Sequence, residues 1–122
     1  MRIRISPAAG AVLAMLGTVV AHAQDAAAGK QVFAQCAACH SIDGTNGVGP
    51  SLKDVVGRKA GTFPGFRYSR AMKNANITWT VQNLDAYIAN PQGVVPRNLM
   101  PFSGLPGAKE RAELVAYLET LK

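Results

Sequence analysis

Two cysteines and a histidine form the segment Cys36-Ala37-Ala38-Cys39-His40, in which the thiols are three residues apart and the imidazole follows at once. On a helical turn, residues three and four apart share a face, so both thiols and the imidazole can face one object. Thiols can add to vinyl groups and an imidazole can bind a metal ion. This spacing is the attachment signature of a c-type haem. The motif therefore predicts one haem c, covalently attached through Cys36 and Cys39, with His40 as a ligand of its iron.

The N-terminal residues have the pattern of a secretory signal. Two arginines precede an apolar run from Ala8 to Ala21, which ends in the small-x-small triplet Ala21-His22-Ala23. An uncleaved membrane anchor is the alternative, but the run is shorter than the ~18 to 20 residues that a membrane span needs. We predict that residues 1–23 are a signal peptide cleaved after Ala23 and that residues 24–122 form one domain. The protein would then be exported to the periplasm as a soluble monomer without stable membrane insertion.

Other interpretations of the two cysteines explain the segment less well. Outside residues 1–23, His40 is the only histidine and Cys36 and Cys39 are the only cysteines. A dithiol redox pair is typical of a βαβ context, which the sequence lacks, and it leaves His40 without a role. A structural zinc site needs four ligands, and only three are present. Coincidental spacing of two buried cysteines is disfavoured in an exported chain.

An iron atom bound by His40 has an opposite position that is either open or filled by a second side chain. Outside the signal peptide only Met72 and Met100 offer a thioether. Met100 lies in a proline-bounded loop that could cross to the opposite face of a haem, whereas Met72 lies in a short helical segment, where methionine usually packs in the core. A thioether opposite His40 would close the iron to oxygen and peroxide and favour electron transfer.

Hydrophobic periodicity predicts an all-α fold with about three main helices and one or two short ones. The main helices are expected near 26–38, near 80–89 and from about 109 to the C-terminus, and a short one near 69–74. Between them, residues 41–67 contain eight glycines and prolines, which break any long helix or strand. No segment alternates apolar and polar residues as a half-buried strand would. We therefore expect a small all-α domain in which helices are joined by long, irregular loops.

Length and composition restrict the function further. The 122 residues suit a single domain, and 48% hydrophobic with only 16% charged residues excludes a disordered tail. Outside the signal peptide, eleven basic and seven acidic residues give a formal charge of +4. The basic residues are scattered and lack the clustered stripe with aromatic residues that nucleic acids require, so we expect a protein partner and no nucleic acid. A domain this small and loop-rich has few large side chains for a core of its own. We therefore expect a bound group, such as a haem, to fill its interior.

Over essentially all of residues 24–122, the sequence resembles the class I c-type cytochromes, in particular the group of mitochondrial cytochrome c and bacterial cytochrome c2. The resemblance is specific, because many short motifs occur in family order. They are Gly29-Lys30-Gln31-Val32-Phe33, Cys36-Ala37-Ala38-Cys39-His40, Gly49-Pro50-Ser51-Leu52, Gly57-Arg58-Lys59-Ala60-Gly61, Pro64-Gly65-Phe66-Arg67-Tyr68, Ile77-Thr78-Trp79, Tyr87-Ile88-Ala89-Asn90-Pro91, Met100-Pro101-Phe102 and Leu114-Val115-Ala116-Tyr117-Leu118.

The resemblance implies the small cytochrome c fold, in which helices and long loops wrap around a covalently bound haem, and it implies roles for individual residues. His40 and Met100 would be the axial ligands, and the Pro50 carbonyl would accept a hydrogen bond from the second imidazole nitrogen, which makes the ring a better donor. A buried haem propionate needs hydrogen-bond donors, which are implied to be Arg58, Tyr68 and Trp79.

Further positions follow from the same resemblance. Tyr87 would lie near the sulfur of Met100, and Phe102 beside the exposed haem edge. Gly29 and Phe33 would pack the first helix against the last. Without the resemblance, Arg58 would be interpreted as a surface charge and Trp79 as a core residue, which are the commoner fates of these residue types.

The implied function is that of a periplasmic single-haem electron carrier, which moves one electron between redox proteins and is not an enzyme. Its donor and acceptor would be membrane complexes or soluble redox enzymes. The alternative is a peroxidase-like or gas-binding c-type haem protein with a labile sixth ligand. Some positions depart from the family. Met72 and Asn98 replace a usual asparagine and threonine, and the lysines around the mitochondrial haem edge are replaced here by Gln35, Gln92, Gly93 and Leu99.

Overall fold

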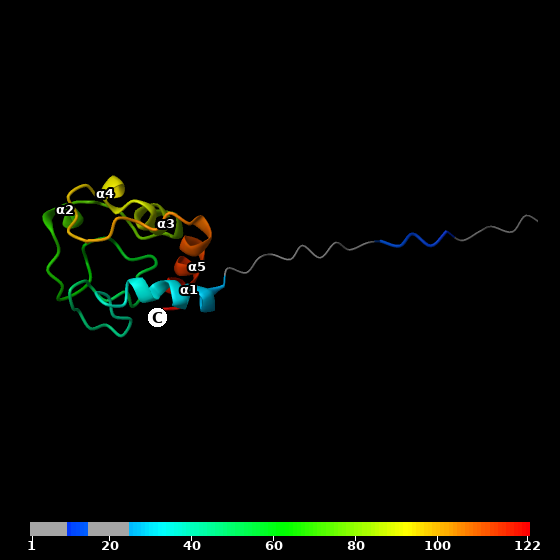
Figure 1. Cartoon of the computed structure of the whole chain (residues 1–122), viewed down its shortest axis with the longest axis horizontal. Helices are drawn as coiled ribbons and strands as arrows, with labels where there is room; N and C mark the ends of the chain where they lie inside the picture. Colours follow the sequence, from blue (N-terminus) through cyan, green and yellow to red (C-terminus); the bar gives the residue numbers. More distant parts are fainter. Residues whose placement is uncertain (1–9, 15–24) are drawn as a thin grey trace, which may run out of the picture.

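The computed structural model describes residues 10–14 and 25–122. The predicted signal peptide and its cleavage site lie outside the described residues, apart from 10–14. Figure 1 shows helices around a loop-rich body. The described part of the chain contains no β-strand, only an isolated bridge between Lys59 and Thr78, so the all-α prediction is confirmed. The elements are α1 (Ala26–Val32), the 3₁₀ turn η1 (Phe33–Gln35), α2 (Arg70–Lys73), α3 (Val81–Ala89), α4 (Pro91–Val94) and α5 (Ala108–Glu119).

The first helix begins as expected but is shorter than predicted. Asp25 caps it, because its carboxylate accepts hydrogen bonds from the backbone of Ala27 and Ala28 at 2.9 and 3.1 Å. The α-helix ends at Val32, and the expected continuation to residue 38 is wrong. The last turn tightens into η1, a frequent feature of helix ends that alanine-rich composition does not reveal.

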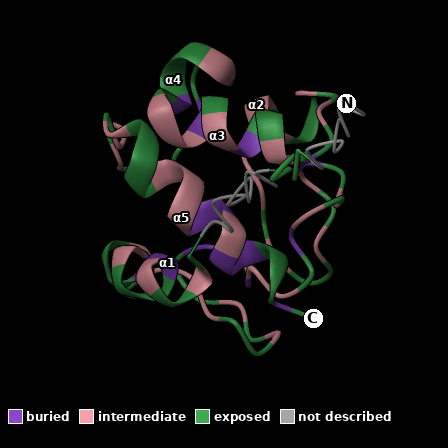
Figure 2. Ribbon diagram, turned by 90° about the vertical axis from the view of Figure 1, so that its right-hand side faces the viewer, coloured by how far each residue is buried: buried purple, intermediate pink, exposed green. Residues whose placement is uncertain are grey.

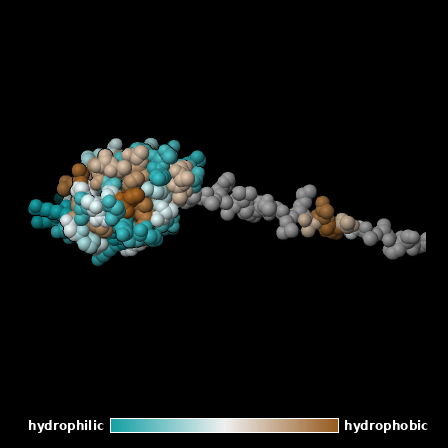
Figure 3. Space-filling model, turned by 90° about the horizontal axis from the view of Figure 1, so that it is seen from below, coloured by the Kyte–Doolittle hydropathy of each residue, from teal (hydrophilic) through white to brown (hydrophobic). Residues whose placement is uncertain are grey.

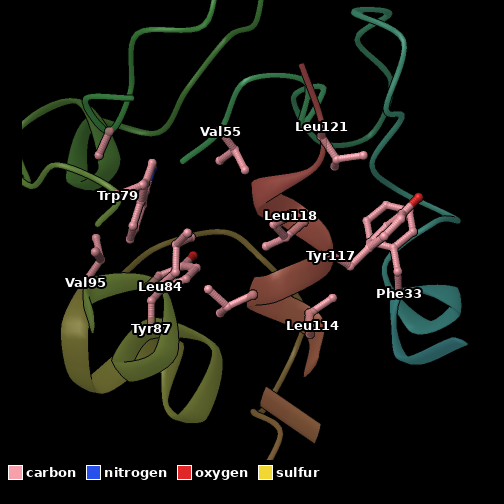
Figure 4. Close-up of a cluster of buried hydrophobic side chains, with 12 residues drawn as sticks. Phe33, Val55, Trp79, Leu84, Tyr87, Val95, Leu114, Tyr117, Leu118 and Leu121 are labelled. Carbon is pink, nitrogen blue, oxygen red and sulfur yellow. The ribbon is translucent and has the colours of Figure 1, made fainter. Parts of the chain in front are cut away.

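The first and last helices, α1 and α5, pack against each other in the core. Gly29 is buried where α1 touches α5, and the rings of Phe33 and Tyr117 lie 5.3 Å apart. Figure 4 shows these two rings side by side, on the opposite side of α5 from Trp79 and Tyr87. This confirms the expected contact between the first and last helices. Figure 2 shows buried residues along α5, which forms the centre of the core.

We expect Gly29→Ala to destabilise the folded protein by about 3 kcal/mol, since a core overpacked against backbone has little room to adjust. A Cβ on Gly29 would lie 1.9 Å from the carbonyl oxygen of Glu113 in α5. Denaturant unfolding of the haem-loaded protein measures the loss. Gly47→Ala is the matched control, because its Cβ would have no neighbour closer than 3.8 Å. Equal stability of the two variants would contradict the close approach of α1 and α5.

The third and fourth helices precede the segment that contains Met100. Thr80 caps α3 by accepting from the backbone of Asn83 at 3.1 Å, and α3 ends before Asn90-Pro91 as predicted. A new short helix, α4, then starts at Pro91, a residue well suited to a first helical turn. Later in the chain, Arg111 of α5 forms an ion pair with Asp85 of α3 at 2.9 Å, which joins these two helices.

The loops between η1 and α2 are held by short polar side chains. Ser51 is fully buried, and its hydroxyl accepts from the backbone of Gly44 and Lys53 and donates to the carbonyl of Ser41. Asn46 binds the backbone of Ser51 and of Pro64. These hydrogen bonds hold the predicted glycine- and proline-rich loops in one defined conformation.

Within residues 10–14 and 25–122, none of the helices has the length and apolar character needed to cross a membrane. The face of the body visible in Figure 3 is largely hydrophilic, with a small hydrophobic patch near its centre.

Candidate haem site

The two thiols lie in consecutive tight turns directly after η1. The backbone of Cys39 and His40 donates to the carbonyl of Cys36 at 3.1 and 2.9 Å, so the segment keeps a helical sense without being an α-helix. Both cysteines are free and partly exposed. Burial, and next the neighbouring Cys39, raise the pKa of the Cys36 thiol. In the described ranges, no group of three or more His, Cys, Asp or Glu side chains is placed to hold a metal ion.

The His40 imidazole is oriented by the backbone around Pro50. Its Nδ1 lies 2.7 Å from the Pro50 carbonyl oxygen. Because that oxygen can only accept, Nδ1 carries the proton and Nε2 keeps its lone pair for a metal. Gly49 lies against the ring: a Cβ there would come within 2.6 Å of Cε1. Burial, the largest effect, lowers the pKa of His40, which further favours the neutral imidazole.

Met100 lies on a different segment from His40, with its sulfur facing Tyr87 of α3. The Tyr87 hydroxyl donates to Met100 Sδ at 3.9 Å, which is the contact the family resemblance implies. Burial raises the pKa of Tyr87 to about 12, so the phenol keeps its proton. In Figure 1 the segment after η1 runs along the lower side of the body, and the segment after α4 along the upper side. These two segments therefore lie on opposite sides of the body in this view.

Arg58 and Trp79 are brought together by the bridge at Lys59 and Thr78. The backbone of Trp79 donates to the Arg58 carbonyl at 2.8 Å, and the Trp79 side chain is buried against Tyr87, with ring centroids 4.9 Å apart. This pairing of two distant segments positions one predicted propionate donor beside another.

The Arg58 guanidinium is half-buried yet pairs with no carboxylate in the described part of the chain. It donates to the carbonyls of Ser51, at 3.0 Å, and Lys53, and lies over the ring of Phe63. Burial, the main effect, lowers its pKa. The hydroxyl of Tyr68 accepts from the backbone of Phe63 at 3.1 Å. A half-buried cation without a protein anion suits an anionic group of a cofactor.

Phe102 is half-buried two residues after Met100, and its backbone donates to the Met100 carbonyl at 2.9 Å. Met72 of α2 packs partly buried against the core, as Met100 also does. The contacts of Gln92 and Asn98 with the backbone beside Met100 were not expected from the sequence. Their sequence signal is two amide side chains six residues apart, Gln92 in α4 and Asn98 in the loop that follows it.

The donor set fits a covalently bound haem. Two free thiols, a neutral imidazole with one available nitrogen, a half-buried thioether and a half-buried guanidinium are the chemical groups that such a cofactor needs. The family model for cytochrome c matches residues 26–122. The chain belongs to the cytochrome c family. Membership implies one covalent haem c, and it makes the chain a single-haem electron carrier and not an enzyme.

Named relatives agree with this assignment. The chain is 51% identical to cytochrome c-type cyt cy of Rhodobacter capsulatus over 98 residues, which cover 80% of this chain but only about half, 49%, of that protein. It is 49% identical to cytochrome c2 of Rhodomicrobium vannielii over 100 residues, 80% of each chain. The solved structure of cytochrome cH from Methylobacterium extorquens superposes with a TM-score of 0.77 at 44% identity, covering 79% of this chain and 98% of that one.

Proposed function

We propose that the protein carries single electrons between redox proteins of the periplasm through a haem attached to Cys36 and Cys39, with His40 and Met100 as axial ligands. The observation that carries this proposal is the contact of the Met100 sulfur with the Tyr87 hydroxyl. A thioether held in this way is prepared to close the sixth position of an iron. A carrier needs that closure, whereas a peroxidase or a gas-binding protein needs an open position.

Each residue has a distinct task in this mechanism. When bound, the haem supplies one-electron chemistry at its iron. Pro50 holds the His40 ring in one tautomer and one orientation, and Gly49 leaves room for it. Tyr87 directs the Met100 sulfur. Because both ligands are held by their surroundings, the protein changes little between oxidation states, and little rearrangement accompanies each electron.

The periphery of the haem has its own proposed contacts. Arg58, Tyr68 and Trp79 would hold a buried propionate, and Phe102 would lie beside the exposed edge. The partners would be a donor and an acceptor protein, with the carrier itself monomeric and exported by residues 1–23. Because Gln35 and Leu99 stand where mitochondrial proteins carry lysines, association with an acidic partner should depend only weakly on salt.

Optical spectra of the purified protein test the carrier against its rivals. We expect a c-type haem spectrum in the reduced form, a mass above that of the polypeptide by one haem, and negligible uptake of carbon monoxide by the reduced protein. Rapid carbon monoxide uptake would instead indicate a gas-binding protein. Rapid cyanide binding by the oxidised form at neutral pH would indicate a peroxidase-like site.

A further inference from the structure

The side-chain amides of Gln92 and Asn98 grip the backbone that leads into Met100. The Gln92 amide nitrogen donates to the Asn98 carbonyl at 3.0 Å, and its oxygen accepts from the Arg97 backbone at 3.0 Å. The Asn98 amide nitrogen donates to the Val95 carbonyl at 2.9 Å, and its oxygen accepts from the Met100 backbone at 2.9 Å. We call these four hydrogen bonds the amide clasp.

The clasp holds a stretch of backbone that is unfavourable on its own. Arg97 has a φ of 64°, in the left-handed region that a residue with a Cβ rarely adopts. The neighbouring bonds through Gln92 stabilise this conformation from both sides of the Arg97–Asn98 peptide. Asn98 is only 6% exposed, so its amide would be costly to leave unpaired. The turn at Arg97 therefore depends on the clasp.

The clasp also decides which way the next side chains face. Leu99 is 78% exposed, while Asn98 before it is buried and Met100 after it is half-buried toward Tyr87. The hydrogen bond from the Met100 backbone to the Asn98 side-chain oxygen maintains this alternation of buried and exposed side chains. Met100 has no other described backbone donor bond than the one to Asn98, so this single amide controls where the thioether starts.

We propose that Gln92 and Asn98 are positioning residues that set how readily the Met100 thioether leaves the haem iron. This inference rests on the proposed ligation by Met100. With the clasp intact the thioether has one backbone position to return to. Without it the segment samples positions from which the sulfur does not reach, and an external ligand binds more readily.

The test is the rate at which cyanide binds the oxidised haem-loaded protein, together with hydrogen exchange of the Met100 amide. We expect Gln92→Ala to speed both roughly twenty-five-fold, because it removes two hydrogen bonds and each net hydrogen bond is worth a factor of about five. Gln92 is exposed, so this variant will fold. Asn98→Ala should have a larger effect. Asn98→Thr should restore part of the wild-type rate, since its hydroxyl can accept from the backbone two residues on.

Asn83→Ala is the matched control. Asn83 also donates a side-chain amide bond to a backbone carbonyl, that of Thr78 at 2.8 Å, but does not touch the clasp. If Gln92→Ala and Asn98→Ala bind cyanide no faster than Asn83→Ala, while Met100→Ala binds it fast, the positioning role is wrong and the ligation stands. If Met100→Ala itself changes neither rate nor spectrum, the proposed ligation has failed and the positioning role falls with it.

Discussion

Met100→Ala is expected to remove the near-infrared band of a methionine-ligated ferric haem and to open the iron to external ligands. The Tyr87 hydroxyl faces Met100 Sδ at 3.9 Å, and no alanine side chain can take the place of the sulfur. If the open form is populated at roughly 1% in the native protein, removing the thioether speeds cyanide binding about a hundredfold. The reduction potential should fall as well, because a thioether ligand favours the ferrous state. Absorption spectra and stopped-flow mixing measure these changes.

Met72→Ala is the control for that experiment, since Met72 is the other candidate thioether. Its side chain packs against the core from α2, and its loss should lower stability by about 2 kcal/mol or more without affecting the band. The reverse pattern, with the band lost in Met72→Ala and kept in Met100→Ala, would show that the other methionine is the ligand.

Replacing both Cys36 and Cys39 by serine is expected to yield a colourless chain without stable tertiary structure. The serine hydroxyls form no thioether bonds, so the haem is not retained covalently. The described core is a single cluster around α5, and many hydrophobic side chains around it are only partly buried, among them Leu52, Met72 and Ile88. Without the haem against them the domain loses most of a stability that is typically about 5 to 15 kcal/mol.

Mass spectrometry and circular dichroism measure that outcome. Ala37→Ser together with Ala38→Ser is the matched control, because both alanines are exposed and lie between the cysteines. It should retain the haem mass and the helical signal. A cooperatively folded double-cysteine variant would contradict the inference that the haem completes the core.

The predictions that held depend on local patterns. The spacing of Cys36, Cys39 and His40 is readable because covalent attachment needs a fixed number of residues. The starts of the helices near residues 26 and 80 were readable because the hydrophobic periodicity begins there, and Asp25 and Thr80 cap the observed helices by bonding to the backbone two or three residues on. The predicted length of the first helix was wrong, since composition does not distinguish an α-helical turn from the tighter turns that follow Val32.

The sequence by itself determined the cofactor and the all-α class and predicted one iron ligand, and the resemblance to a family supplied the rest of the expected site. Only the tertiary structure decided that a Cβ at Gly29 would strike α5, that the half-buried Arg58 pairs with no carboxylate among the described residues, and that Gln92 and Asn98 clasp the Met100 segment. The physical reason is the distance along the chain over which each interaction acts. Attachment and capping act over a few residues, whereas these contacts depend on where separate segments meet after the chain has packed.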